Sequence, residues 1–262
     1  MKTTIRIEKL NISFGYNVLI KDLNLTINQN TILSIFGKNG MGKTTLIKCF
    51  TKQFDNYAGN IYIGDRNVQE FSIEELSKII AVVYSGGELF QDLKVMDYLV
   101  MGCTNKMTLF ENPSNEFYSF AYDMLKSIEK AYLYNKNIFS LSSGEMQIVK
   151  IVRGILQKTQ ILILDEPTEN LDIENQIQVL NLIEDLKNRG YTIIMITHNP
   201  RHMLELGGQI LMLTGGENLI CNSNELFNKN ILNKLSTANV EWIKNNNDFV
   251  MKFYKRDKKL YF

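Results

Sequence analysis

Residues 37–45 are Gly37-Lys38-Asn39-Gly40-Met41-Gly42-Lys43-Thr44-Thr45, which fit the pattern G-x-x-x-x-G-K-[ST] of a phosphate-binding loop. The apolar run 31–36 predicts a buried strand before the loop, and 46–50 predict a helix after it. Glycines let backbone N–H groups approach phosphate oxygens, and a helix start adds partial positive charge. Lys43 can then reach the β- and γ-phosphates, and the Thr44 hydroxyl can bind Mg²⁺. A chance glycine turn is the alternative, against which the flanking strand and helix argue.

A second strand ends in two acidic residues. Residues 161–164 are four aliphatic side chains, and Asp165 and Glu166 follow them directly. This pattern predicts a buried strand that delivers carboxylates at its C-terminal end. Asp165 is a candidate for the Mg²⁺ shell and Glu166 for polarising a water molecule. A solvated turn after the strand is the alternative, and the phosphate loop upstream makes it the weaker interpretation.

Two further segments carry polar groups suited to phosphate. Residues 140–145 open a helix that we expect to run to about Gln157, and their serines and glycine leave free N–H and hydroxyl donors at its start. Residues 193–197 predict a core strand with His198 at its C-terminal end, where the phosphate loop and the acidic pair also leave the sheet. We therefore expect His198 to contact a γ-phosphate, although a lone histidine is usually structural. His202 is expected to be a surface or capping residue.

The remaining pattern predicts strands, a helical insertion and a short C-terminal extension. An exposed aromatic ring at Phe14 or Tyr16 could stack on adenine, or could pack at a sheet edge. Helices are expected at Val95–Met101, after Ser114, and at Ile173–Arg189 with Gly190 at its end. A capping box at Ser72-Ile73-Glu74-Glu75 predicts another helix start. Strands are expected at 3–7, 23–27, 59–65, 79–84 and 209–213, and a small hairpin at 240–243 and 249–254.

Composition excludes several classes of protein. The chain has 262 residues, 45% of them hydrophobic and 22% charged, which is ordinary for a globular protein with a core. The net charge of +1 gives no overall field that would recruit nucleic acid or an anionic membrane. Its three cysteines are far apart, which argues against a disulfide framework or a zinc site. With no apolar run long enough for a span or a signal core, we expect a cytoplasmic chain.

These pieces together resemble the nucleotide-binding subunit of ABC transporters, over residues 1–225. Gly37–Thr45 is similar to Walker A, Ile161–Glu166 to Walker B with its catalytic glutamate, and Thr197-His198 to the switch histidine. The segment Leu141-Ser142-Ser143-Gly144-Glu145 resembles the family signature LSGGQ, with serine for its first glycine and glutamate for its glutamine. Residues 167–172 resemble the D-loop, and Phe14 falls where the family places its adenine-stacking aromatic. Residues 95–102 and the glutamate in the signature resemble importers of iron–siderophore, haem or cobalamin.

The resemblance implies an α/β fold. It would comprise a P-loop NTPase core with a mostly parallel sheet and flanking helices, an N-terminal antiparallel β subdomain and an inserted helical subdomain at about 88–157. Residues 226–262 would form a small C-terminal extension. The family binds ATP and Mg²⁺, and Ser142, Ser143, Gly144 and Glu145 would complete the ATP site of a second copy packed head to tail. Partners would be transmembrane permease subunits and a substrate-binding protein, with the chain on the inner face of the cell membrane and no nucleic acid bound.

One position departs from the family pattern. The family usually ends the strand at 79–84 with a glutamine that touches Mg²⁺ and the attacking water, and here that position is Ser85. Gln91 lies too far along the chain to replace it without a shifted loop. Because serine is shorter, its hydroxyl would need a bridging water to reach the metal. The hypothesis is slower or differently coupled hydrolysis.

Three other functions compete with a transport ATPase. One is a soluble ABC ATPase without a membrane partner, such as the kind that serves iron–sulfur assembly. Another is a binding module that switches on ATP without useful hydrolysis, which Ser85 favours and the acids Asp165 and Glu166 with His198 oppose. The third is a nucleic-acid-directed ABC protein, against which the near-neutral charge and the single nucleotide-binding segment argue.

Overall fold

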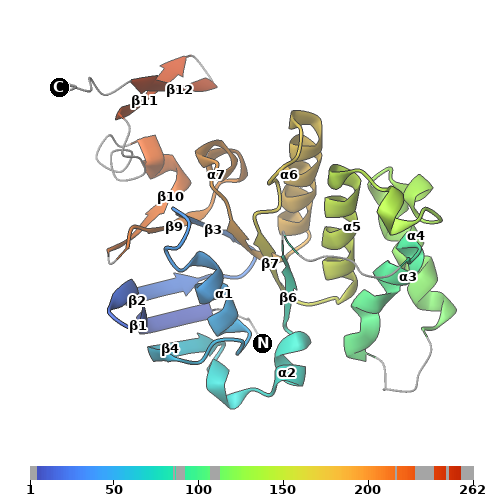
Figure 1. Cartoon of the computed structure of the whole chain (residues 1–262), viewed down its shortest axis with the longest axis horizontal. Helices are drawn as coiled ribbons and strands as arrows, with labels where there is room; N and C mark the ends of the chain where they lie inside the picture. Colours follow the sequence, from blue (N-terminus) through green and yellow to red (C-terminus); the bar gives the residue numbers. More distant parts are fainter. Residues whose placement is uncertain are drawn as a thin grey trace.

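The computed structural model describes residues 5–84, 86, 92–106, 113–215, 217–227, 239–245 and 248–254, with side chains up to residue 225 except 104–106. Figure 1 shows a central sheet with the N-terminal strands on one side and a group of helices at the opposite end of the molecule. The described residues include no helix that combines the length and the apolar character needed to cross a membrane.

A six-stranded sheet forms the centre of the fold, in the order β10-β9-β3-β8-β7-β6. Five neighbouring strands run parallel, and only β10 at the edge is antiparallel. The strands are β3 (Ile32–Gly37), β6 (Ile80–Val83), β7 (Ile161–Asp165), β8 (Thr192–Ile196), β9 (Gln209–Leu213) and β10 (Asn218–Asn222). The predicted strands at 79–84, 161–164, 193–197 and 209–213 are thereby confirmed. Because parallel strands share one C-terminal edge, this sheet brings the ends of β3, β7 and β8 together.

Alternate residues of the central strands face two separate hydrophobic cores. Ile161 and Ile163 of β7 point into a core shared with the N-terminal sheet and α1, whereas Leu162 and Leu164 point into a core shared with the helices of the other face. β8 divides in the same way. A sheet covered on both faces explains why these strands read as continuous aliphatic runs in the sequence.

The N-terminal sheet is antiparallel and has the order β2-β1-β4-β5. Its strands are β1 (Ile5–Phe14), β2 (Asn17–Ile27), β4 (Tyr57–Ile63) and β5 (Arg66–Asn67). β1 and β2 are longer than the predicted strands at 3–7 and 23–27. The pairing shifts register between Ile7 and Leu10, where Lys9 has a left-handed φ of 47°. Such a bulge breaks the two-residue alternation on which the prediction depended.

Helices pack on both faces of the central sheet. They are α1 (Lys43–Phe50), α2 (Ile73–Ser77), α5 (Ser143–Leu156), α6 (Ile173–Asn188) and α7 (Pro200–Leu206), with short 3-10 turns at Val68–Glu70 and Ser223–Phe227. The Ser72 capping box that predicted α2 is present, and α6 ends before Gly190, whose φ is 95°. Both helix boundaries are confirmed.

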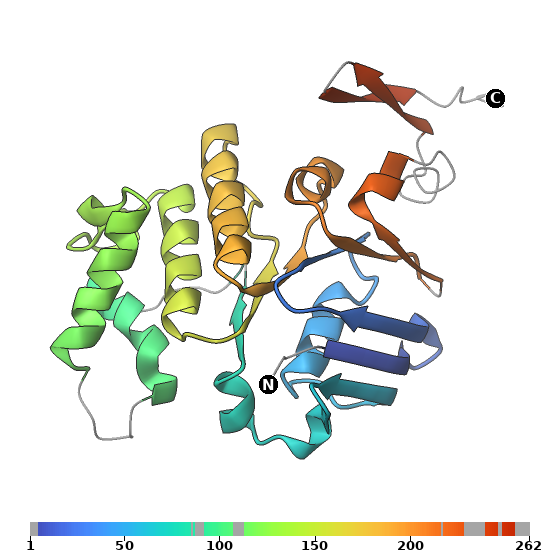
Figure 2. The same cartoon turned by 180° about the vertical axis from the view of Figure 1, so that it is seen from behind.

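The middle of the chain forms a helical lobe, seen from behind in Figure 2. It contains α3 (Val95–Val100), α4 (Asn115–Ser127) and 3-10 turns at Met101–Lys106, Ala131–Leu133 and Ile138–Ser140. α4 confirms the helix predicted after Ser114, and its residues Ala121, Met124 and Leu125 are buried in the core. α4 packs on α5, and α5 on α6.

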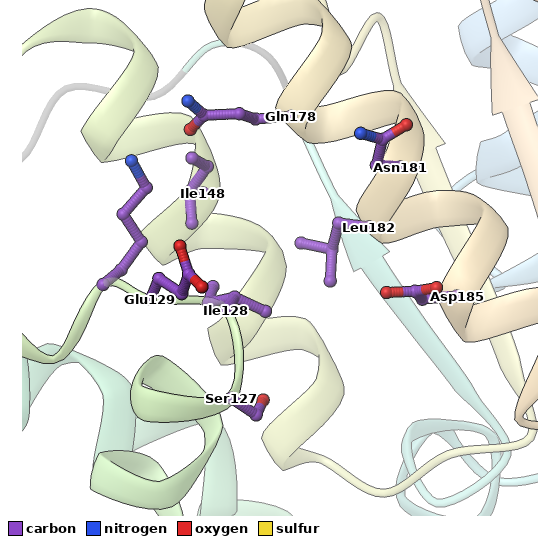
Figure 3. Close-up of a pocket in the computed structure, with 9 residues that line it drawn as sticks. Ser127, Ile128, Glu129, Ile148, Gln178, Asn181, Leu182 and Asp185 are labelled. Carbon is purple, nitrogen blue, oxygen red and sulfur yellow. The ribbon is translucent and has the colours of Figure 1, made fainter.

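A pocket of about 350 Å³ separates the end of α4 from α6 and is lined by Ile148, Gln178, Asp185 and their neighbours (Figure 3).

The last described residues form a two-stranded hairpin of β11 (Asn239–Asn245) and β12 (Asp248–Tyr254), which confirms the predicted hairpin. In Figures 1 and 2 it stands beyond β10, at the end of the molecule opposite the helical lobe. The domain limits 1–225 and 226–262 stay predictions.

Candidate nucleotide site

The glycine loop joins the end of β3 to the start of α1. Gly42 is the N-cap of α1 and has a φ of 91°, a conformation that favours glycine. A Cβ added there would also lie 3.1 Å from Leu19 Cβ of β2, and one added at Gly37 would lie 2.7 Å from the Leu213 carbonyl oxygen. Gly37 is therefore required by close approach and Gly42 is favoured by its positive φ, and the N-terminal sheet and β9 hold the loop on either side.

Lys43 folds back over this loop and is almost fully buried, with 6% of its surface exposed. Its Nζ donates to the carbonyl oxygens of Gly37 at 2.6 Å and Lys38 at 3.2 Å, and to Asn39 Oδ1 at 3.5 Å. Burial lowers the pKa of Lys43, whereas the carboxylates of Glu166, Asp165 and Glu169 raise it. The ammonium thus stands within the field of three acids, and its contacts lie along the glycine loop.

Asp165 meets the glycine loop at the C-terminal edge of the sheet. Its Oδ2 accepts a hydrogen bond from the Thr44 hydroxyl at 3.5 Å, across the 121 residues that separate them in the chain. Burial raises the pKa of Asp165, while the Thr44 hydrogen bond and the Lys43 charge lower it. A hydroxyl and a carboxylate side by side are the oxygen donors that Mg²⁺ prefers. The two segments predicted to meet at one Mg²⁺ therefore do lie together.

Glu166 adopts a left-handed backbone conformation, with a φ of 50°, directly after β7. Its N–H donates to the Ile196 carbonyl of β8 at 3.1 Å, and its own carbonyl accepts from the Glu169 N–H at 3.1 Å. Its carboxylate contacts His198 Nε2, and the contact is an ion pair when the imidazole is protonated. Burial raises the pKa of Glu166, and a hydrogen bond with Glu169 raises it further. A carboxyl with a raised pKa beside a histidine is suited to handling a proton.

The two histidines differ in their surroundings. The His198 side chain is 40% exposed and faces Glu166 at the strand ends, as its predicted place in the sequence requires. His202 is only 4% exposed, so the expectation of a surface residue is wrong. Its ring lies between Thr168 Oγ1 and Asn199 Nδ2. With Met203 and Leu206, which are also buried, it forms the inner face of α7, and that helical spacing is the signal the sequence offered.

Phe14 lies at the end of β1, where the chain turns into β2. It is 52% exposed and stands 5.2 Å from Phe54, centroid to centroid. Tyr16 in the turn is fully exposed. The expectation of an exposed aromatic at this place is confirmed, and a ring supported on one side leaves its other face for a planar ligand. Adenine stacking stays a prediction.

The segment Ser142–Glu145 forms the start of α5. Ser142 is the N-cap, and its hydroxyl accepts from the Glu145 N–H, while Glu145 Oε2 accepts from the Ser142 N–H at 2.9 Å. Glu145 Oε1 also accepts from Tyr132 and Lys136, at 3.1 Å each. Gly144 is buried against Asn175 of α6, whose Cγ would lie 2.3 Å from an added Cβ. Ser142 and Ser143 are exposed, whereas Glu145 is committed to the helix start.

The structure brings most of the predicted site residues to one edge of the sheet. Lys43, Thr44, Asp165, Glu166 and His198 form one group there, and the start of α5 stands apart from them on the helical lobe. Ser85 and Gln91 lie outside the described residues. Sequence reasoning placed Thr168 and Glu169 in the D-loop-like segment 167–172 without giving either residue a role. Both line a pocket of about 170 Å³ with Glu166, His198 and His202.

Comparison with known proteins agrees with this geometry. A family model described as ABC transporter matches residues 20–169. An uncharacterized ABC transporter ATP-binding protein of Haemophilus influenzae is 32% identical over 209 residues, which are 79% of this chain and 80% of that one. The iron(3+)-hydroxamate import ATP-binding protein of Bacillus subtilis is 29% identical, over 80% of this chain and 78% of its own. Among solved structures, a chain of a transporter assigned to the metal-chelate ABC type, in an inward-facing conformation, superposes with a TM-score of 0.83 and 24% identity over 97% of each chain.

Proposed function

This chain belongs to the ABC transporter family as an ATP-binding subunit, an ATPase coupled to transport, and from that premise we propose that it powers import of an iron chelate or a related metal chelate. The main support for a nucleotide site is the 3.5 Å hydrogen bond between the Thr44 hydroxyl and Asp165 Oδ2, with Lys43 in the same loop as Thr44. The substrate class is supported by the relatives named for iron-hydroxamate import and for iron chelatin transport, each 29% identical.

Each residue of the site has a distinct role in the proposed reaction. Lys43 and the N–H groups of residues 38–45 bind the β- and γ-phosphates, and Phe14 stacks on the adenine. Thr44 and Asp165 hold the Mg²⁺ that accompanies ATP, with Ser85 as a further contact through water. Mg²⁺ supplies charge neutralisation on the phosphate oxygens. Glu166 orients the attacking water and accepts its proton, and His198 steadies Glu166 and the γ-phosphate.

A second copy of the chain completes the site. The glycine loop contacts Leu19 and Leu213, whereas the start of α5 contacts Tyr132, Lys136 and Asn175. The exposed serines at the start of α5 therefore serve a nucleotide on another copy, packed head to tail. Three large apolar side chains near this helix start support an interface, being 51% to 76% exposed: Phe139, Ile173 and Ile177.

The proposed partners are a transmembrane permease and a substrate-binding protein. The ATP-binding subunit would then sit on the inner face of the cell membrane through the permease, and closure of the two copies on ATP would drive the permease to change conformation. Affinity capture of the tagged chain from detergent-solubilised membranes tests this. Recovery of a multi-span membrane subunit supports transport, whereas recovery of soluble partners alone supports the rival role in a soluble assembly.

The chemistry is tested by Glu166→Gln. Removing the proton acceptor while keeping the shape should lower the steady-state ATPase rate at least about a hundredfold, with the Kd for Mg-ATP changed less than about threefold. Turnover is measured by phosphate release and affinity by calorimetry. Turnover retained in the variant would assign the base to another residue. A wild-type protein that binds Mg-ATP without turning it over in the presence of its partner would favour the ATP-switched binding module.

A further inference from the structure

His202 on α7 has no part in the reaction proposed above, yet both nitrogens of its buried ring have partners. Nδ1 lies 3.2 Å from Thr168 Oγ1, in the loop that follows β7. Nε2 lies 3.0 Å from Asn199 Nδ2, at the start of α7. The ring therefore spans the space between two loops that belong to neighbouring strands of the sheet.

The hydrogen bonds around Asn199 define which nitrogen of His202 carries the proton. Asn199 Oδ1 accepts from the Arg201 N–H at 3.0 Å and so caps α7. The amide NH₂ of Asn199 must then face His202, and because Nδ2 only donates, Nε2 must accept. Nδ1 consequently bears the hydrogen and donates to Thr168 Oγ1. The arrangement requires a neutral ring, since a protonated Nε2 would point a hydrogen at the Asn199 NH₂.

The two loops joined by His202 also carry the proposed catalytic pair. Thr168 comes two residues after Glu166, and Asn199 directly follows His198. The Glu166 carboxylate contacts His198 Nε2. We propose that His202 is a positioning residue: its neutral ring links these two loops by hydrogen bonds and so fixes the positions of Glu166 and His198 relative to each other. The inference rests on the ATPase function proposed for Glu166, and it makes the tie dependent on pH.

Charged groups surround His202 from three sides. Arg201 and Glu205 lie on its own helix. Glu166 and Glu169 lie on the loop after β7 and His198 on the loop after β8, and these three residues line the same pocket as His202. Burial lowers the pKa of His202 below 6.5, with Glu205 acting to raise it and Arg201 to lower it. Burial thus favours the neutral ring, and acidification that protonates Nε2 would break the bond to Asn199.

The ring nitrogens can be observed directly in the resting protein. The chain contains two histidines, so ¹⁵N-labelled histidine gives two pairs of imidazole nitrogen signals, which His202→Gln assigns. At pH 7.5 the His202 ring should be the Nδ1–H tautomer, and on titration it should gain its charge at a lower pH than a free imidazole does. A ring that is Nε2–H or charged at pH 7.5 overturns the proposal, whether or not the protein hydrolyses ATP.

Activity tests the positioning role with a pair of variants. His202→Leu removes both hydrogen bonds and should lower kcat about tenfold while leaving the KM for ATP within about twofold. His202→Gln keeps one donor and one acceptor and does not titrate. It should recover most of the lost kcat and should reduce the decline of kcat between pH 7.5 and 5.5.

Thr168→Val removes the other partner of the tie, because it replaces the hydroxyl by a methyl group of similar size. Thr168→Val should lower kcat in the same way as His202→Leu. Thermal unfolding of each variant, compared with wild type, checks that the effect is not a folding defect. Equal kcat in wild type, His202→Leu and Thr168→Val would overturn the tie. A wild-type protein that lacks ATPase activity would instead remove the proposed function, and the tautomer measurement would still decide the state of the ring.

Discussion

Glu166 shows how a single residue can be held in an unfavourable conformation for a purpose. A left-handed conformation costs a residue with a side chain about 1–2 kcal/mol. Its backbone N–H and carbonyl are nonetheless fixed by Ile196 and Glu169. The result is a carboxylate that leaves the strand end toward His198 rather than continuing the direction of β7. Strain of this kind concentrates at functional sites, because surrounding contacts overdetermine the backbone there.

Ser85 stands where the resemblance to the family leads us to expect a glutamine. A longer amide at this position could reach Mg²⁺ and the attacking water without a bridging water. We expect Ser85→Gln to raise the steady-state ATPase rate about fivefold, which corresponds to about 1 kcal/mol of barrier. ATPase rates of both proteins, measured with and without the permease, check this. Equal rates and equal coupling to the permease would remove the idea that Ser85 slows hydrolysis.

The start of α5 combines a structural and a proposed functional role, and α2 offers a matched control. Both helices begin with a serine and a glutamate that satisfy each other's backbone N–H groups, Ser142 with Glu145 and Ser72 with Glu75. Replacing either serine by alanine should lower the free energy of unfolding by about 1 kcal/mol. Only Ser142→Ala should also lower the ATPase rate, because only this hydroxyl is proposed to face a nucleotide.

Urea unfolding and ATPase rates of Ser142→Ala and Ser72→Ala decide between the two roles. If both variants lose stability equally and neither loses activity, then the start of α5 is only a helix cap. If Ser142→Ala loses activity without losing stability, the capping description is the part that fails.

The elements that the sequence predicted well are those whose signal is local. The strand, loop and helix around residues 37–50 follow from glycine spacing and an aliphatic run, and the acids after β7 follow from the end of another run. β1 and β2 were predicted too short because the bulge at Lys9 is set by pairing with distant strands. The edge strand β10 was not predicted, since its residues 218–222 alternate weakly and its partner β9 defines it.

The sequence predicted the individual residues of the site, but it did not predict the hydrogen bonds that connect them. Asp165 and Thr44 were expected to meet because parallel strands share an edge. His202 was not expected inside because histidine is polar, and only its helical spacing with Met203 and Leu206 indicates the inner face of α7. Its role depends on the rotation of α7 and on Thr168, and both are products of tertiary packing rather than of the sequence nearby.

At the scale of the whole molecule, the proposed ATP site is divided between two copies. The chain supplies a phosphate loop on the sheet and exposed serines on the helical lobe, and these make contacts in different parts of the fold. Glu166→Gln with Mg-ATP should therefore form a stable dimer, because hydrolysis would otherwise open it. Light scattering after size exclusion measures this, with ADP as one control.

Ile177→Glu in the Glu166→Gln background is the second control, since it places a charge on an exposed apolar position of α6 without touching the glycine loop. It should prevent the dimer and leave Mg-ATP binding to the single copy intact. A Glu166→Gln protein that stays monomeric with saturating Mg-ATP would contradict the head-to-tail arrangement.

The claim on which the account depends is that the loop bearing Lys43 and the strand ending at Asp165 bind one magnesium–triphosphate group. Calorimetry of ATP binding to the purified chain, with and without Mg²⁺, tests it in wild type and Asp165→Asn. Mg²⁺ should raise the affinity of wild type at least about tenfold, a difference of about 1.4 kcal/mol, and should change that of Asp165→Asn little. No affinity for Mg-ATP in wild type, or the same magnesium dependence in both proteins, would contradict the account.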